Sequence, residues 1–165
     1  GFGFGGIGVS AAIFHMIYHS LIKSALFLSA GTIFLKYSTT KISKVRGVIA
    51  TLPVTGLLFF TGLFAITGAP PFGIFLTKAF ILSAGVRNHV FASVAALFFV
   101  AILFIGFFKH VVTITFGERP PELSVEKESV WIIAPPLMLM AVALCISFYI
   151  PPFLYTLVNE AASRF

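Results

Sequence analysis

Residues 7–35 read IGVSAAIFHMIYHSLIKSALFLSAGTIFL, an apolar stretch of membrane-crossing length that contains three basic side chains. These are His15, His19 and Lys23, which are spaced four residues apart. A helix turns about 100° per residue, so this spacing places all three on one face over roughly 12 Å. Lys23 lies near the middle of the stretch, where an ammonium group costs about 2.5–3.5 kcal/mol. The stretch therefore predicts a transmembrane helix whose basic face meets protein, water or a partner charge.

Four further apolar segments follow, at residues 48–67, 74–86, 90–116 and 130–149. Pro70 and Pro71 separate the first two, because they remove two backbone donors and prevent a continuous helix. Residues 74–86 would form a helix of only about 20 Å, whereas the hydrocarbon core is about 30 Å thick. A short segment interrupted by proline is typical of a discontinuous helix. The pattern predicts an all-α, polytopic transmembrane helix bundle of about five spans, including this short proline-interrupted helix.

Two polar loops separate the spans, at residues 36–46 and 117–129. If each of the five spans crosses the membrane, these loops lie on opposite sides. The first loop is richer in lysine and arginine, which favours its side as the cytoplasmic one. The chain also opens without methionine, on glycine and phenylalanine that already resemble membrane sequence. We therefore expect residues 1–165 to be the C-terminal part of a longer membrane domain, ending in a short interfacial helix.

The composition excludes several classes of protein. Charged residues make up 10% of the chain and hydrophobic residues 59%, whereas a soluble domain is about 25% charged. The bilayer is thus one expected partner. The net charge of +6 comes from scattered basic residues without a dense patch, so no nucleic acid is expected. Cys145 has no partner for an internal disulfide, and the glycine-rich start lacks the features of a phosphate loop, so no cofactor is expected.

Lys78 is the second lysine that the sequence places at membrane depth, on the short helix after the proline break. No Asp or Glu lies within any predicted span, so neither Lys23 nor Lys78 has a local carboxylate partner. Histidine titrates near neutral pH, and lysine is used as a proton carrier when it is buried. We therefore expect His15, His19, Lys23 and Lys78 to form a proton relay that faces a hydrated interior.

Other interpretations of these residues stay open. Lys23 could pair with an acid on another helix, and Lys78 could lie near a membrane surface. His15 and His19 could be packing residues, and their spacing also suits zinc. However, the sequence offers no third ligand, and the lysine that follows would repel a cation. No metal site is therefore expected.

Two motifs resemble those of a known family. Residues 15–31, HMIYHSLIKSALFLSAG, resemble the H-xxx-H-xxx-K-(A/S)-x-LF-x-x-(A/S)-G helix of antiporter-like subunits. Such subunits occur in respiratory complex I, in membrane-bound hydrogenases and in Mrp-type cation/proton antiporters. Residues 68–78, GAPPFGIFLTK, resemble their G-x-P-P-F-x-x-F-x-(S/T)-(K/E) signature. The likeness covers nearly the whole chain and looks closest to hydrogenase-4 component F of formate hydrogenlyase-type complexes, although many members of that branch carry Glu at the position of Lys78.

The resemblance implies a subunit of roughly fourteen helices with two inverted half-channels, of which this chain holds the last part. His15, His19 and Lys23 fall on its central relay helix, and Lys78 falls on its discontinuous helix. The implied function is proton translocation in a complex I-like or hydrogenase-type oxidoreductase of a prokaryotic cytoplasmic membrane, with redox chemistry in partner subunits. The alternatives are a component of a Na⁺/H⁺ antiporter and a structural scaffold of a membrane complex.

Overall fold

The computed structural model describes residues 1–125 and 127–164, and every regular element in these ranges is helical. The elements are η1 (Phe2–Phe4), α1 (Ile7–Tyr37), η2 (Ile42–Lys44), α2 (Val48–Thr51), α3 (Pro53–Ile66), α4 (Gly73–Asn88), α5 (Val90–Phe116), α6 (Val130–Phe148) and α7 (Pro152–Ala162). Among the described helices, α1, α5 and α6 are each long and apolar enough to cross a membrane. The predicted class, an all-α membrane bundle, is confirmed.

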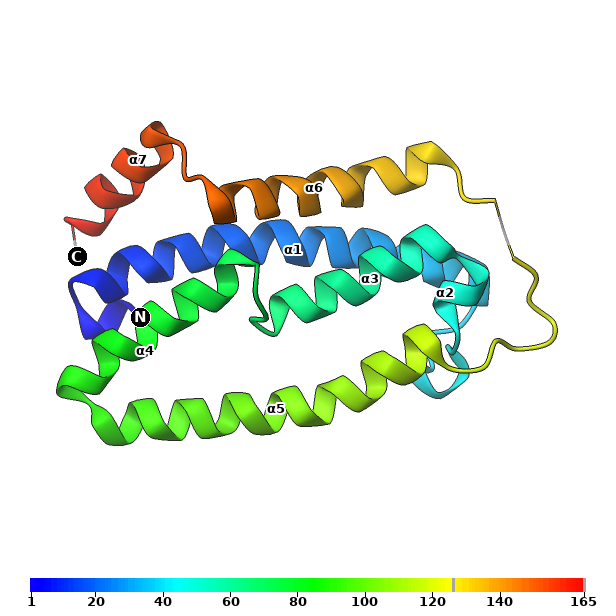
Figure 1. The fold of residues 1–165 in the computed structure, drawn as a ribbon, viewed down its shortest axis with the longest axis horizontal. Coiled ribbons are helices and arrows are strands. Elements are labelled where there is room, and N and C mark those ends of the chain that lie inside the picture. The colour runs from blue at the N-terminus through cyan, green and yellow to red at the C-terminus, as the bar shows by residue number, and fades with distance from the viewer. Residues whose placement is uncertain (126, 165) are drawn as a thin grey trace.

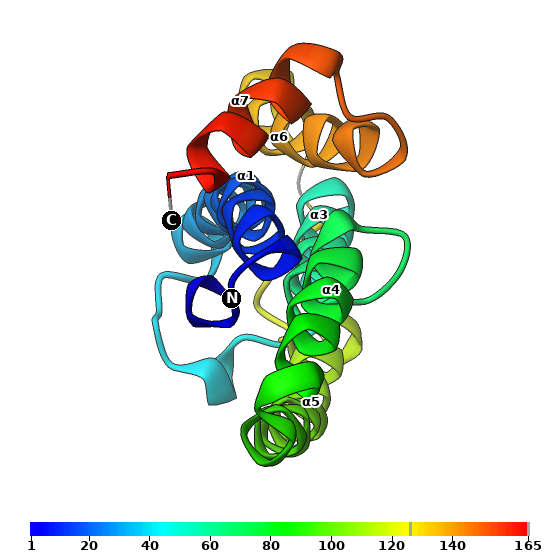
Figure 2. The same cartoon turned by 90° about the vertical axis from the view of Figure 1, so that its left-hand side faces the viewer.

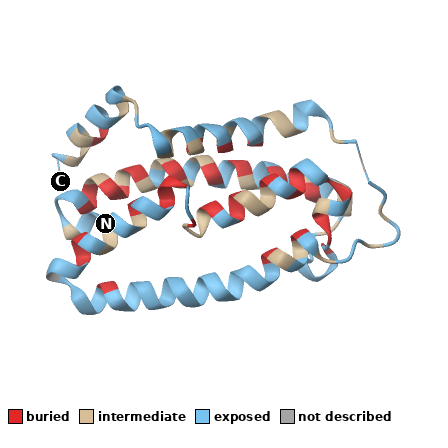
Figure 3. Cartoon of the chain, in the orientation of Figure 1, coloured by how far each residue is buried: buried red, intermediate tan, exposed pale blue. Residues whose placement is uncertain are grey.

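Helix α1 is the centre of the bundle. It lies between α6 on one side and the pair α3 and α4 on the other, with α5 beyond that pair (Figures 1 and 2). Its side chains Tyr18 and Ile22 are 3% and 0% exposed, and the buried residues concentrate on α1, α3 and α4 (Figure 3). The most complete packing therefore surrounds the helix that carries His15, His19 and Lys23.

Helices α3 and α4 lie in line along α1 rather than side by side (Figure 1). The contacts show that α1 and this pair run in opposite directions. From the start of α1 onward, the contacting residues are Gly8 with Ala84, His15 with Thr77, Tyr18 with Gly73, and Leu26 with Gly62. The stretch from Gly8 to Leu26 is about 27 Å of helix, close to the thickness of a hydrocarbon core. The predicted segments 48–67 and 74–86 are therefore two halves of one discontinuous path, antiparallel to α1.

The first of these halves is itself broken near its start. The sequence predicts a single helix over residues 48–67, but α2 ends at Thr51 and α3 begins at Pro53. Leu52 between them has φ −131° and ψ 80°, which is not helical. A proline disfavours helical backbone at the residue before it, and Pro53 therefore starts a new helix. The bounds of α5 coincide with the predicted 90–116.

The two polar loops meet at the same end of the bundle. A side chain at Gly47 would meet the carbonyl oxygen of Gly117, and the Tyr37 hydroxyl donates to the Arg46 carbonyl beside them. The expectation that these loops lie on opposite sides is wrong, because α3 and α4 together run the length of the bundle only once. Most of the lysine and arginine residues consequently lie in these two loops or in the helix turns beside them: Lys36, Lys41, Lys44, Arg46, Lys109, Arg119 and Lys127.

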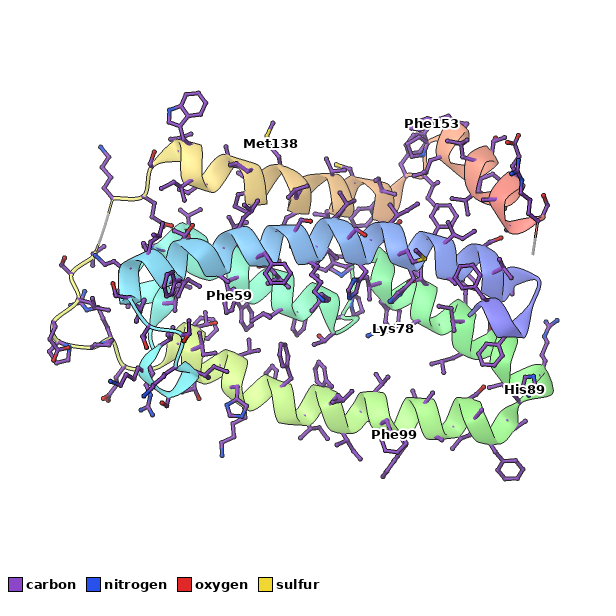
Figure 4. The ribbon with its side chains drawn as sticks, turned by 180° about the vertical axis from the view of Figure 1, so that it is seen from behind. Phe59, Lys78, His89, Phe99, Met138 and Phe153 are labelled. Atoms are coloured by element: carbon purple, nitrogen blue, oxygen red, sulfur yellow. The ribbon has the colours of Figure 1, made fainter. Side chains whose placement is uncertain are left out.

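Helices α5 and α7 differ in how they join this core. Helix α5 packs on α3 and α4 but is exposed along most of its length, and Phe99 points away from α1 (Figure 4). Helix α7, the expected terminal helix, lies across the end of α6 and over α1 (Figure 2). Val158 anchors it and is 3% exposed. Helix α7 thus covers one end of the space between α1, α4 and α6.

Candidate functional site

The basic face of α1 divides into a packed part and an open part. The rings of His15 and His19 stack with their centroids 6.0 Å apart, and both side chains are partly buried. One turn further on, Lys23 is exposed, and its Nζ lies 5.9 Å from the centroid of the Phe27 ring. None of the carboxylates that the structure describes pairs with it. The structure thus brings the two histidines into the bundle but leaves Lys23 on an outer face.

The discontinuous helix breaks between Ile66 and Gly73. Gly68 has φ +89°, a left-handed conformation that glycine adopts without steric cost. Pro70 and Pro71 follow, joined by a cis peptide bond, and both are exposed. The chain then returns to helical backbone at Gly73. The sequence-predicted residues Pro70 and Pro71 therefore lie inside the break, near mid-length of α1 (Figure 1).

Lys78 reaches back from α4 to the end of α3. Its Nζ donates a hydrogen bond of 2.9 Å to the Thr67 carbonyl oxygen, and its side chain passes over Gly68. The last carbonyl groups of a helix lack partners and carry the negative end of the helix dipole. The ammonium group therefore stabilises a helix end that the break would otherwise leave unsatisfied. Figure 4 shows Lys78 between this break and α5.

A cavity of about 260 Å³ lies beside Lys78. It separates the break from α5, and its walls include Thr67 and the phenylalanines Phe104 and Phe107. The ammonium group thus has a backbone acceptor on one side and open, mostly apolar space on the other. Such space leaves Lys78 room to exchange its carbonyl partner for another acceptor.

Thr77 joins the basic face of α1 to the discontinuous helix. The Nδ1 atom of His15 lies 2.9 Å from the Thr77 hydroxyl oxygen, and that hydroxyl also lies 3.1 Å from the Ile74 carbonyl oxygen. Thr77 is 5% exposed, and Lys78, the next residue, is near enough to His15 for their charges to interact. Sequence reasoning did not single out Thr77. The signal was its hydroxyl directly before Lys78, at the (S/T) position of the motif.

Side chains of α1 and α6 hold the start of α4. The Gly73 N–H donates to the Ser147 hydroxyl at 2.7 Å, and the Tyr18 hydroxyl donates to the Ile146 carbonyl at 2.9 Å. A Cβ atom at Gly73 would overlap the Tyr18 ring. Contacts with α1 and α6 therefore hold the break in place. Sequence reasoning missed Tyr18 and Ser147, because neither is a basic residue of α1 or part of the proline break.

The site contains proton-exchanging groups but no metal cage. Within the described ranges, no three His, Cys, Asp or Glu side chains come together as metal ligands would. His15, Thr77 and Lys78 instead form a short row of groups that can donate or accept protons, at the junction of α1 with the break. His19 continues the row along α1, and Lys23 lies beyond it on the open face.

Comparison with known proteins identifies the family. A family model described as NADH:quinone oxidoreductase/Mrp antiporter, TM, matches residues 1–104, which contain the whole site. The chain belongs to this family. It is therefore an integral membrane protein, and the predicted resemblance is confirmed.

Individual relatives come from two kinds of complex. The chain is 29% identical to a Na(+)/H(+) antiporter subunit of Bacillus subtilis over 94% of its length, and 21% of that protein is covered. It is 35% identical to a hydrogenase-4 component F homolog of Methylacidiphilum infernorum over 71% of its length, and 25% of that protein is covered. The chain thus spans about a quarter or less of these curated relatives.

The fold also matches a solved structure. The Mrp complex from Dietzia sp. DQ12-45-1b contains a chain that superimposes with a TM-score of 0.82 at 23% identity, covering 97% of this chain and 38% of that one. At this level of identity the match supports the fold alone. The in-line arrangement of α3 and α4 along α1 therefore belongs to a fold that is found in a membrane complex.

Proposed function

We propose that this chain forms part of a proton half-channel in an antiporter-like membrane subunit. The observation that carries the proposal is the junction of α1 with the broken helix, where His15 contacts Thr77 and Lys78 caps α3. Groups that exchange protons are rare at membrane depth and mark ion pathways when they occur. Here they come from two helices and meet where the backbone between α3 and α4 is interrupted.

The proposed path runs along the basic face of α1. His15 and His19 lie one turn apart with stacked rings, and Lys23 is one turn further on. Lys23 is exposed in the described residues, so it is available to groups of the longer protein or to water. Lys78 would receive or release protons at the opposite end of the row. Conformational or electrostatic signals from partner subunits would drive the transfer.

The host complex is proposed to be a complex I-like or hydrogenase-type oxidoreductase in a prokaryotic cytoplasmic membrane. The identity of 35% to a hydrogenase-4 component F homolog supports this choice. Redox chemistry would then take place in partner subunits. The partners are other membrane and redox subunits of the same assembly.

The test uses the full-length protein in its assembled complex. Lys78→Gln and His15→Ala are compared with Lys109→Gln, which alters an exposed lysine on α5. Proton uptake into inverted vesicles is measured by dye quenching and normalised to electron transfer, and assembly is checked on native gels. We expect both site variants to lose most of the proton transport, while Lys109→Gln keeps it. Full transport in assembled Lys78→Gln complexes would refute the relay and favour the scaffold alternative.

A second candidate function is Na⁺/H⁺ exchange, with this chain as a component of an antiporter. Its support is the match to the Na(+)/H(+) antiporter subunit of Bacillus subtilis, which extends over 94% of this chain. The two functions differ in what drives proton movement. In vesicles with an imposed pH gradient and no electron donor, addition of Na⁺ would release the dye quench if the protein is an antiporter. A component of an oxidoreductase would respond to the electron donor and not to Na⁺.

A further inference from the structure

A polar cavity lies where the two loops of the chain meet, at the end of the bundle opposite α7 (Figure 1). It measures about 660 Å³, and its walls come from residues 37–46 and residues 118–123. The first stretch follows the end of α1, and the second follows the end of α5. Both helices are long and apolar enough to cross a membrane. The cavity therefore lies where the chain leaves the bilayer.

Two glycines bring the backbones of these loops into contact. Gly47 has φ +62°, and a Cβ atom there would lie 2.8 Å from the backbone nitrogen of Arg119. On the other loop, a Cβ atom at Gly117 would lie 3.3 Å from the Cβ atom of Arg46. Larger residues at either glycine would push the loops apart. The contact thus places two arginines, one from each loop, side by side at the cavity.

The cationic side chains of the lining are available to a ligand. Lys44, Arg46 and Arg119 are exposed, and none forms a salt bridge with a carboxylate that the structure describes. The Nε atom of Arg46 donates to the Ser43 carbonyl oxygen at 3.2 Å, which orients the guanidinium group. Guanidinium groups bind phosphate oxygens through paired hydrogen bonds. Two such groups at one cavity therefore indicate a phosphate as the ligand.

Two carboxylates limit the charge that the cavity can accept. Glu118 and Glu122 belong to the same lining, and neither is paired with a cation within the described ranges. Three cationic and two acidic side chains leave one positive charge. A phosphodiester carries one negative charge and would neutralise it, whereas a doubly charged phosphate monoester would bring an excess of negative charge. The lining is thus matched to a phosphodiester.

Apolar side chains continue from the cavity toward the bilayer. Phe34 lies three residues before Tyr37 on α1, so the two share one face of the helix, and Phe34 is 49% exposed. Ile42, on the loop that follows, is 61% exposed. A soluble phosphate would gain nothing from such neighbours, whereas the acyl chains of a lipid would pack against them. The surroundings therefore favour a phospholipid as the source of the phosphodiester.

We propose that this cavity binds the headgroup of an anionic phospholipid, with Arg46 and Arg119 holding the phosphate and the acyl chains lying beside Phe34. Basic pockets beside transmembrane helices on the cytoplasmic side suit such headgroups, and the lysine and arginine count favours this end as cytoplasmic. A lipid held by both arginines would tie the loop after α1 to the loop after α5. The site lies apart from the proposed relay, so neither proposal depends on the other.

The first experiment measures occupancy of the cavity by cysteine protection. Thr39→Cys lies in the lining, and Ser124→Cys, exposed on the second loop outside the lining, is the control. Both are made in the full-length protein of the assembled complex in detergent, and maleimide labelling of this subunit is followed by peptide mass spectrometry. We expect phosphatidylglycerol to slow labelling of Thr39→Cys by about tenfold at a concentration about ten times its dissociation constant. Labelling of Ser124→Cys should not change.

Phosphatidylcholine and inorganic phosphate distinguish the possible ligands. We expect neither to protect Thr39→Cys, because the first has no net charge and the second has no acyl chains. Unchanged labelling with phosphatidylglycerol would overturn the proposal. Equal protection by phosphatidylcholine would show that the cavity does not select an anionic lipid, and protection by inorganic phosphate would identify a soluble anion as the ligand. Either of these results would also overturn it.

The second experiment tests the arginines with matched changes of charge. Arg119→Gln and Lys127→Gln each remove one positive charge from an exposed position of the same loop, but only Arg119 lines the cavity. In the Thr39→Cys protein, we expect Arg119→Gln to abolish protection by phosphatidylglycerol and Lys127→Gln to keep it. The labelling rate without lipid shows whether the loops keep their conformation, and Arg46→Gln repeats the test from the first loop. Full protection in Arg119→Gln and Arg46→Gln would refute the proposed phosphate contacts.

Discussion

Glu128 provides the most quantitative test of how the loop before α6 is joined to the start of α3. Its carboxylate accepts hydrogen bonds from the Val54 N–H at 2.7 Å and the Thr55 N–H at 2.9 Å, and also from the Thr55 hydroxyl. These are first-turn groups of α3, which begins at Pro53 and has no cap from its own segment. A carboxylate there satisfies unpaired donors and interacts with the positive end of the helix.

We expect Glu128→Ala to destabilise the chain by about 2 kcal/mol. Hydrogen bonds to a charged group contribute about 1.5–3 kcal/mol, and loss of a helix cap about 0.5–2 kcal/mol. The value lies below the sum because Glu128 is only partly buried, so that water replaces some of the lost contacts. For a chain of this size, the midpoint of thermal unfolding falls by about 2–4 °C per kcal/mol, and hence by about 4–8 °C.

The assay is thermal unfolding in detergent, followed by circular dichroism of the helices. Glu128→Gln keeps the shape but replaces one acceptor oxygen by a donor, so we expect an intermediate loss. Glu122→Ala is the control, because Glu122 is exposed on the same loop, and surface changes are usually within about 0.5 kcal/mol. If Glu128→Ala and Glu122→Ala unfold at the same temperature, the carboxylate does not cap α3 and the reasoning fails.

Two further predictions concern packing and topology. Gly73→Ala should lower the free energy of unfolding by about 1–3 kcal/mol, because the added methyl group overlaps an aromatic ring of α1. In the control Gly106→Ala the methyl group meets nothing within 4 Å, so this change should be neutral or slightly stabilising. Thermal unfolding distinguishes the two variants. The topology is tested with single cysteines in a background without the native cysteine. An impermeant maleimide should label Ser43→Cys and Glu122→Cys from the same side of the membrane and His89→Cys from the other. The count of lysine and arginine favours the side of Ser43 and Glu122 as the cytoplasmic one. Labelling of Ser43→Cys and Glu122→Cys from opposite sides would contradict the single discontinuous path.

Several features of the fold could be predicted because they depend on neighbouring residues. The apolar run of residues 90–116 has polar neighbours at both ends, and the predicted helix has the bounds of α5. The glycine and proline residues at 68–73 cannot continue a helix, so the interruption was evident before any packing was known. The helix-ending effect of Pro53 was equally local, but the long apolar run around it concealed the boundary at Leu52.

The contacts that make the site could not be predicted in the same way. Tyr18 is not one of the three basic residues of α1, Ser147 is isolated in an apolar stretch of α6, and nothing near them in the chain shows what they bind. Their partners lie on other helices and are visible only after α1, α4 and α6 have packed. For Lys23 the sequence shows only part of the answer. Its spacing with His15 and His19 places the three residues on one face of α1, but it does not show what that face contacts.

The sequence by itself determined that this chain is a helical membrane protein, that basic residues share one face of its first long helix, and that a second helix is broken at Pro70 and Pro71. These properties follow from hydropathy, helical periodicity and the missing N–H of proline, which act over a few residues. Only the tertiary structure decided that α3 and α4 lie in line, that the Thr77 hydroxyl contacts the His15 ring and that Lys78 caps α3. Such contacts bring together groups that are distant in the chain, 62 residues apart for His15 and Thr77, and packing rather than local pattern selects them.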